Sequence, residues 1–503
     1  MELQNLYEAL SYIKPEISVA VYLILIVLFD LIFNNDKKFL HYIALIGVLV
    51  TGFFVIDQFG FTGTAFLSEG NPSAQGMVAI DPFGSFFKLI VLIASVLIIL
   101  FSMSSDEIKK SFDRLGEYYT LMFGMILGMF MMISASDLIL IYLSIELLSL
   151  SSYVLAGFTK LRDRNSEAAL KYIIYGAVSS GLMLFGISII FGLTGNTNIF
   201  VINQILQTAD INLVAFSTAV LLVFVGIGFK ISAAPFHFWT PDVYEGSPIT
   251  ITAFLSVASK AAGFALLIRL IKSMFIIDVT EQGYWQLVES FDWKSLLIIV
   301  SILTMTLGNF SALWQDNLKR MLAYSSIAHA GYILLGIAVL SNQGLLAVLI
   351  YFLVYTIMNL GAFFIVMIIA NKTGSENIDD YDGLGITTPF LGVALAIFLV
   401  SLTGLPPTAG FIGKLYLFIA LVDAQMIVVA LIALLNTVVS LYYYIRVLKH
   451  LFLTKPTEQT SVVPVSGMNT VLIILLIIPV LFFGIYFTPM VDLARNGIAM
   501  LGF

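Results

Sequence analysis

Long apolar runs dominate this sequence and limit the folds that it can adopt. The chain is 60% hydrophobic and only 11% charged, a composition that excludes an ordinary soluble domain. A helix needs about 20 mainly apolar residues to cross a bilayer. We therefore predict an all-α polytopic membrane protein with about 14 transmembrane helices. The apolar runs lie at 17–33, 39–56, 84–102, 118–134, 137–158, 168–193, 212–240, 248–272, 294–313, 321–340, 344–370, 388–422, 425–446 and 470–490.

Lysine and arginine are spread unevenly over the predicted loops. An even helix count places both termini on one side, and cytoplasmic loops carry the excess of Lys and Arg. With the N-terminus outside, fifteen of the 24 basic residues are cytoplasmic, four are outside and five lie within helices. The bias predicts outer N- and C-termini. The cytoplasmic set is Lys37, Lys38, Lys109, Lys110, Arg114, Lys160, Arg162, Arg164, Lys171, Lys319, Arg320, Lys372, Arg446, Lys449 and Lys455, and the outer set is Lys14, Lys272, Lys294 and Arg495.

Two of the predicted helices, the seventh and the twelfth, are interrupted. The seventh contains GFKISAAPFHFWTPDVYEGSP and the twelfth contains SLTGLPPTAGFIGKLY. Proline removes a backbone donor and frees carbonyls, which inside a membrane must be satisfied by protein or internal water. Broken helices in corresponding halves indicate inverted repeats, here helices 4–8 and 9–13. The alternative is that the prolines only kink these helices for packing.

The predicted helices and loops belong to one membrane domain, because the outer connections near 57–83 and 273–293 are too short for a core of their own. Within 1–503 we expect three N-terminal helices over 1–117, a first repeat over 118–272, a second over 294–450 and a last helix at 470–490.

Four ionisable residues, Glu146, Lys230, Lys260 and Lys414, lie deep within apolar runs. A charge at the bilayer centre costs about 2.5–3.5 kcal/mol even on lenient insertion scales, so such residues usually pair, face water or carry ions. Glu146 is nine residues into its helix, or about 14 Å along it. It is either a protonated carboxyl that supports packing or a carboxylate paired with a lysine.

Each lysine sits at a distinctive place. Lys230 precedes the first break and Lys414 follows the second, so each is near freed backbone carbonyls. Lys260 is halfway along the eighth helix, about 18 Å from either end, which is too far for its side chain to reach the interface.

Other ionisable residues within the helices are weaker candidates. His329, in AYSSIAHAGY, could bridge Lys260 to Lys414 or could be a structural hydrogen-bonding group. His237 could join a water path beside the first break. Lys88 and Arg269 lie near helix ends, and we expect both to reach the interface.

Redox chemistry in this chain is disfavoured. Cysteine is absent and only four histidines occur, at 41, 237, 329 and 450. Without cysteine the chain cannot hold a thiolate-bound iron–sulfur cluster. Four scattered histidines also provide few ligands for a haem or a multi-histidine metal site. We predict no cofactor and no metal in the chain.

Several motifs together resemble those of a known family. The run PFHFWTPDVYEGSPITITAFLSVASKAAGF is similar to the signature region of antiporter-like subunit N of proton-pumping NADH–quinone oxidoreductase (respiratory complex I). SIELLSLSSYVL, EAALKYIIYGAVSSGLMLFG, LKRMLAYSSIAHAGY and SLTGLPPTAGFIGKLY follow in the family's order and cover most of residues 80–445. The TPDVYEGSP form resembles subunit N more than subunits M and L.

The resemblance implies specific roles and surroundings. It implies that Glu146 and Lys230 form the pair of a first half-channel, that Lys260 and His329 lie on the central axis, and that Lys414 serves the second half. It further implies other complex I membrane subunits as partners, a bacterial inner membrane as the location and a periplasmic outer side. NADH, FMN, iron–sulfur clusters and quinone then belong to the rest of the complex, with no role for nucleic acid.

The leading hypothesis is proton translocation coupled to quinone reduction by other subunits. A second is a subunit of an Mrp-type cation/proton antiporter or of a membrane-bound hydrogenase, against which the TPDVYEGSP run argues. A third is a structural scaffold that anchors a redox arm, and a fourth is a redox enzyme in its own right.

Overall fold

The chain folds into a helical membrane domain in which apolar helices surround a few fully buried ones. The computed structural model describes residues 3–33, 37–66, 76–159, 163–456 and 462–502. In this described part, 13 helices are long and apolar enough to cross a membrane, or 14 if the bent pair Ile378–Thr387 and Pro389–Thr403 is one span. The predicted helical membrane fold with about 14 spans is confirmed.

The N-terminal part packs beside the first half of the core. Helices α2 and α3 cover α6, and α4 lies deeper, against α6, α13 and α16. The predicted loop near 57–83 contributes a short antiparallel hairpin, which the apolar pattern did not reveal. Its elements are α1 (Leu3–Tyr12), α2 (Lys14–Ile32), α3 (Phe39–Asp57), β1 (Gly63–Ala65), β2 (Val78–Ile80), α4 (Pro82–Ser104), α5 (Asp106–Lys109) and η1 (Phe112–Arg114).

The next part contains the first broken helix. Helix α6 ends at Ser134, and Asp137 caps the next helix, α7, in the short gap between the predicted runs 118–134 and 137–158. The elements are α6 (Leu115–Ser134), α7 (Leu138–Ala156), α8 (Asp163–Thr194), α9 (Ile199–Thr208), α10 (Leu213–Ile231), α11 (Trp239–Gly246), α12 (Ile249–Phe254), the π-helical segment η2 (Leu255–Ser259) and α13 (Lys260–Phe275).

The remaining part contains the second broken helix. A hairpin fills the predicted loop near 273–293. The elements are β3 (Ile276–Val279), β4 (Trp285–Leu287), α14 (Trp293–Ala312), α15 (Leu318–Ala338), α16 (Asn342–Thr373), η3 (Ile378–Tyr381), α17 (Leu384–Thr387), α18 (Pro389–Thr403), α19 (Ala409–Asp423), α20 (Ile427–Phe452), α21 (Gly467–Ile485) and α22 (Thr488–Asn496).

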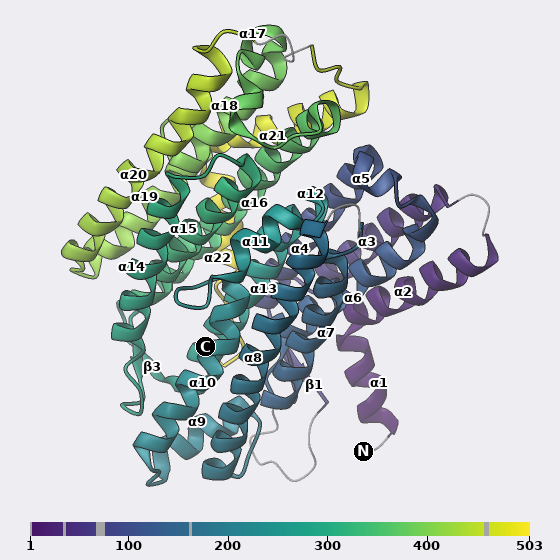
Figure 1. The fold of residues 1–503 in the computed structure, drawn as a ribbon. Coiled ribbons are helices and arrows are strands. Elements are labelled where there is room, and N and C mark those ends of the chain that lie inside the picture. Colours follow the sequence, from purple (N-terminus) through teal and green to yellow (C-terminus); the bar gives the residue numbers. More distant parts are fainter. Residues whose placement is uncertain (1–2, 34–36, 67–75, 160–162, 457–461, 503) are drawn as a thin grey trace.

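The most buried helices occupy the middle of the domain. In Figure 1 the purple helices α2 and α3 and the green-yellow helices α18–α20 lie at opposite ends, with α4, α13 and α16 between them. The span formed by α12, η2 and α13 is completely buried. An apolar helix buried on all sides gains nothing from polar residues unless they are satisfied or functional, so Lys260 on this span needs partners.

Both predicted helix breaks are present. Helix α10 ends at Ile231, and α11 begins only at Trp239. Helix α18 ends at Thr403, and α19 begins at Ala409. The last long helix packs on the second break, because a Cβ at Gly484 of α21 would lie 1.9 Å from the Pro407 carbonyl oxygen. Only glycine permits this approach.

The expectation that Lys88 and Arg269 reach the interface is wrong. Lys88 Nζ lies 2.6 Å from the buried Glu16 carboxylate. Both terminal nitrogens of Arg269 donate to Asp81 at 2.8 Å, and neither side chain is exposed to solvent. Arg269 Nε also donates to the Ile133 carbonyl at 2.8 Å. Each side chain is paired with a carboxylate from a distant part of the chain, and local sequence patterns do not reveal such a pairing.

The Asp81–Arg269 pair fixes the helix that carries Lys260. It joins the start of α4 to α13 and α6, and Asp81 also accepts the Leu501 N–H at 3.1 Å. Removing one partner would leave the other charge buried and unpaired. Lys160 and Arg162, two of the predicted cytoplasmic residues, lie outside the described residues.

We predict that Arg269→Met destabilises the protein by about 3–5 kcal/mol, because it strands the Asp81 carboxylate. The measurement is thermal unfolding of the purified complex together with its yield on native gels. The control is Lys109→Ala, which breaks a pair whose side chains are 56% and 48% exposed, so little change is expected. The double variant Arg269→Met/Asp81→Leu should recover much of the loss. An Arg269→Met complex that melts like the Lys109→Ala complex would contradict the prediction.

Candidate functional site

Lys230 lies at the end of α10, the first half of the broken seventh helix, and three aromatic rings surround its amine. Its side chain is buried, and Nζ has no hydrogen-bond partner among the described residues. The centroids of the Tyr153, Tyr172 and Phe229 rings lie 5.8, 5.6 and 5.6 Å from Nζ. Ring faces attract a cation but do not accept its protons, so this amine is poised to exchange a proton rather than locked in place.

Glu146, on α7, is the carboxylate that acts on Lys230. It attracts the lysine electrostatically, and no direct ion pair joins the two in the described part of the chain. The carboxyl group is half-buried: Oε1 is buried without a partner among the described residues. On the same helix Leu143, Leu147 and Leu150 are exposed. The acid therefore lies between the core and the outer face of α7.

Lys260 follows directly after the π-helical segment η2. Its Nζ donates to the Ser326 carbonyl at 2.8 Å and to the Ser326 hydroxyl at 2.6 Å. Tyr355 of α16 donates to the same hydroxyl at 2.9 Å. π-Helical turns shift the register of a helix and are frequent at functional sites. Here the turn directly precedes Lys260, the lysine near the middle of this wholly buried span.

His329, on α15, is surrounded by tyrosines. Nδ1 is 2.8 Å from the Tyr351 hydroxyl, and Nε2 is 3.5 Å from the Tyr444 hydroxyl. Both ring nitrogens thus face groups that can donate or accept, so the tautomer can change without loss of a partner.

Lys414 packs into the second break. Nζ donates to the Thr403 carbonyl at 2.8 Å, one of the backbone groups that the end of α18 leaves free, and reaches Thr437 at 3.5 Å. It also lies 4.7 Å from the centroid of Tyr332. That tyrosine contacts Thr437 at 3.1 Å, and its ring centroid lies 6.2 Å from that of His329. Lys414 and His329 are therefore connected through one aromatic residue.

We call the five predicted residues the row. Contacts with Ser326 and shared tyrosines connect Lys260, His329 and Lys414. A Cβ on Gly263, three residues after Lys260, would lie 3.5 Å from Lys230 Cβ, and Glu146 acts on Lys230 from α7. Sequence reasoning missed the hydroxyl groups between them. Their signal was present as Ser and Tyr residues in apolar helices, but such residues are common in packing roles too. The missed residues are Tyr172, Ser326, Tyr332, Tyr351, Tyr355, Thr437 and Tyr444.

His237 lies beside the first break, as expected, but is not built into the row. Its side chain is buried, its Nδ1 has no described partner, and its ring stacks on Phe238 at 4.5 Å.

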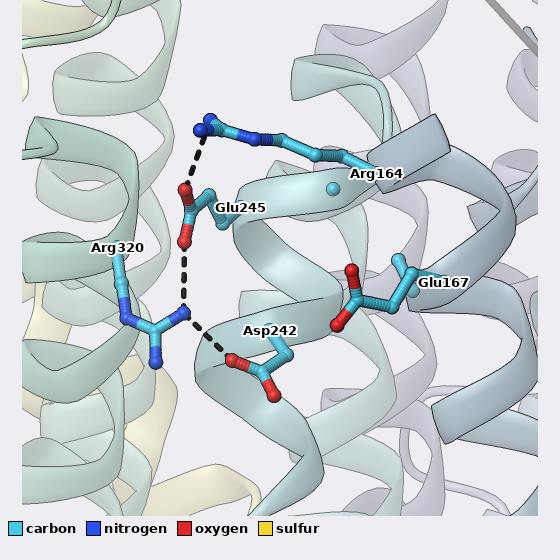
Figure 2. A pocket seen from close by; sticks show the side chains of 7 residues that line it. Arg164, Glu167, Asp242, Glu245 and Arg320 are labelled. Atoms are coloured by element: carbon cyan, nitrogen blue, oxygen red, sulfur yellow. Dashed lines mark hydrogen bonds and ion pairs between the residues drawn. The ribbon is translucent and has the colours of Figure 1, made fainter. Parts of the chain in front are cut away.

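A group of charged residues ties the first broken helix to the second half, and we call it the charged clasp. Figure 2 shows Arg320 of α15 between Asp242 and Glu245 of α11, with N–O distances of 2.6 and 2.8 Å, and Arg164 of α8 at 3.1 Å from Glu245. Lys171 of α8 pairs with Asp242 at 2.6 Å. The clasp holds α11 against α15, the helix that carries Ser326 and His329.

No metal site is evident in the described ranges, where no group of three or more His, Asp or Glu side chains could hold an ion. The chemistry available to this row is proton transfer between amines, an imidazole, a carboxylate and hydroxyls.

Comparison with known proteins shows the family of this chain. The sequence model of the family described as NADH:quinone oxidoreductase/Mrp antiporter transmembrane subunits matches residues 135–440. The chain belongs to this family. The matched segment of this chain includes all five predicted residues: Glu146, Lys230, Lys260, His329 and Lys414.

Two relatives match nearly the whole chain. NADH-quinone oxidoreductase subunit N 2 of Chloroherpeton thalassium is 45% identical and covers 100% of this chain and 98% of its own length. Subunit N of Chlorobium chlorochromatii is 42% identical over 99% of this chain and 96% of its own length.

Two solved structures share the fold. A chain of respiratory complex I from Thermus thermophilus has a TM-score of 0.77 and 27% identity, covering 96% of this chain and 100% of that one. A chain of the Mrp complex from Dietzia sp. has a TM-score of 0.81 at 21% identity, covering 97% of both chains, which shows a shared fold.

Gly404 lies in the second break, where a larger residue should disturb Lys414. Its φ is +85°, and a Cβ there would lie 2.7 Å from Lys414 Cδ. We predict that Gly404→Ala displaces Lys414 and lowers proton pumping, while assembly is retained. The control is Gly374→Ala, with φ +70° and nothing within 4 Å of the added Cβ, so it carries only the backbone cost of about 1–2 kcal/mol. Equal pumping by the two variants would contradict a role for the position of Lys414.

Proposed function

We propose that this chain is the proton-translocating, antiporter-like subunit N of a NADH–quinone oxidoreductase complex. The observation that carries the proposal is the buried row from Glu146 to Lys414, linked by hydroxyl groups and lying within the segment that matches the family. Buried amines without carboxylate partners are costly in a membrane core and persist where they serve transport.

In the proposed mechanism the charge on Glu146 controls Lys230. While Glu146 attracts Lys230, the amine holds its proton, because an opposite charge nearby favours the charged form. When a neighbouring subunit draws Glu146 away, the ammonium of Lys230 is left among aromatic rings and releases its proton towards Lys260. Lys230 then ends as a neutral amine and Lys260 as an ammonium ion.

The second half carries the proton onward. A proton on Lys260 leaves towards His329 through the Ser326, Tyr355 and Tyr351 hydroxyls, and from His329 towards Lys414 past Tyr332. Like charges repel, so the arrival of a proton at one site lowers the proton affinity of the neighbouring site. Outward release from Lys414 completes one transfer.

The redox chemistry is assigned to other subunits. NADH, FMN, iron–sulfur clusters and quinone would be bound there, and this chain would take part in the enzyme as a membrane subunit. Its partners would be another antiporter-like subunit, small membrane subunits and the lipid bilayer. The half-exposed Glu146 on the apolar face of α7 supports a subunit contact there, since a carboxylate facing lipid alone is costly.

We also propose that the core is two inverted repeats, over 118–272 and 294–450. Each would contain one broken helix, α10 with α11 and α18 with α19. A lysine lies next to each break, Lys230 before the first and Lys414 after the second.

An Mrp-type antiporter subunit is the second candidate, because the family description includes Mrp antiporters. The two candidates differ in their partners and in their ion. The subunits that copurify with the chain, and the dependence of transport on Na⁺, distinguish them.

We place the protein in a bacterial inner membrane with both termini on the outer side, from the bias of basic residues in its loops. Alkaline phosphatase, which is active only outside the cytoplasm, should be active when fused to the C-terminus. A fusion at Lys372, in a predicted cytoplasmic loop, should be inactive. The reverse pattern would overturn the assigned orientation.

The main test uses the intact complex in proteoliposomes. Glu146→Gln and Lys260→Ala should each lower NADH-driven proton pumping about tenfold or more, because each removes a titrating group from the row. Lys372→Ala, an exposed lysine at the end of α16, should pump normally. Full proton-to-electron stoichiometry in the Lys260→Ala complex would refute the route, and normal coupling in both variants would favour a scaffold role.

A further inference from the structure

Tyr244 has a buried hydroxyl that the proposed route does not yet use. The residue lies on α11 and is fully buried, and its Oη has no hydrogen-bond partner among the described residues. A buried hydroxyl without a partner costs free energy and calls for an explanation. Helix α11 packs against α8 and α15, which carry groups that contact Lys230 and Lys260.

The hydroxyl of Ser326, close to Tyr244, has one proton left to donate. Ser326 Oγ accepts from Lys260 Nζ at 2.6 Å and from Tyr355 Oη at 2.9 Å. A hydroxyl has two acceptor positions and one donor, so both acceptor positions are used. Helix α11 packs against α15, and this contact brings the Tyr244 phenol close to the Ser326 hydroxyl, without a direct hydrogen bond between them. The unpartnered Tyr244 oxygen is therefore the natural acceptor for the Ser326 proton.

Tyr244 is also connected to the rings around Lys230. Its ring centroid lies 6.1 Å from that of Trp239, on the same helix, and Trp239 stacks on Tyr172 at 4.4 Å. The Tyr172 ring centroid is in turn 5.6 Å from Lys230 Nζ. The charged clasp holds this helix against α15. Tyr244 thus lies where the surroundings of the two lysines meet.

We propose that the Tyr244 and Ser326 hydroxyls are the bridge by which a proton passes from Lys230 to Lys260, a role that rests on the proposed function. An N–H bond of the Lys230 ammonium breaks, and its proton reaches the Tyr244 oxygen through water. Tyr244 gives its own proton to Ser326 Oγ, which gives its own to the neutral Lys260 amine. Each oxygen forms one O–H bond and breaks one, and the net change is one proton moved between the two amines.

The bridge has two orientations that follow the charge of Lys260. With Lys260 charged, its ammonium donates to Ser326, which leaves the serine proton free to turn towards Tyr244. With Lys260 neutral, its lone pair accepts from Ser326, and Tyr244 donates to the serine. Rotation of the two O–H bonds resets the bridge after each transfer.

The experiment measures NADH-driven proton pumping by the assembled complex in proteoliposomes. Tyr244→Phe keeps the ring and removes only the hydroxyl, and Ser326→Ala removes the second one. Both should lower pumping about tenfold. Ser326→Thr restores a hydroxyl and should pump near the wild-type rate. The matched control is Tyr381→Phe, since Tyr381 in η3 is also fully buried with no described partner for its hydroxyl.

The outcomes separate the bridge from the route that it serves. Normal pumping by Tyr244→Phe, in a preparation where Lys260→Ala blocks pumping, overturns the bridge and leaves the route intact. If Tyr244→Phe fails to assemble, the Ser326 pair decides, and equal pumping by Ser326→Ala and Ser326→Thr overturns it. Full pumping by Lys260→Ala refutes the route itself and the bridge with it.

Discussion

The arrangement depends on how a lysine amine is kept in the dry centre of a membrane domain. Three lysines of the row are almost completely buried, and among the described residues none is paired directly with a carboxylate. Lys260 and Lys414 instead donate to neutral oxygens: Lys260 to the hydroxyl and carbonyl of Ser326, and Lys414 to the Thr403 carbonyl at the end of α18. Such partners lower the cost of the charge without cancelling it, so each amine can lose its proton.

The contrast with Lys88 and Arg269 shows what distinguishes a structural charge from a transport charge. Each of these two has a buried carboxylate within 2.8 Å or less. In a direct ion pair in a low-dielectric interior the basic side chain keeps its proton. The two charges also stay together, because either charge alone would be buried without a partner. The same membrane domain therefore uses paired charges to fix helices and unpaired amines for its proposed chemistry.

The broken helices connect sequence chemistry to the site. Proline and glycine end α10 and α18 in mid-domain, and the freed groups lie next to Lys230 and Lys414. Thr403, the last residue of α18, supplies the carbonyl that Lys414 uses. The second halves, α11 and α19, begin only at Trp239 and Ala409. Helix α11 carries Tyr244 and the acids of the charged clasp against α15, so the first break also sets the contact between the two halves of the row.

The sequence by itself determined the class of fold, the approximate helix boundaries and the two breaks, and it marked the five residues to which we assign proton transfer. Those features are local: apolar run length, proline chemistry and the cost of a charge at mid-membrane act wherever the chain folds. It could not decide which charges are paired, because Asp81 and Arg269 are 188 residues apart and meet only after α4 packs on α13. For the same reason Ser326 and Tyr355 looked like ordinary packing residues until tertiary packing brought their hydroxyls together at Lys260.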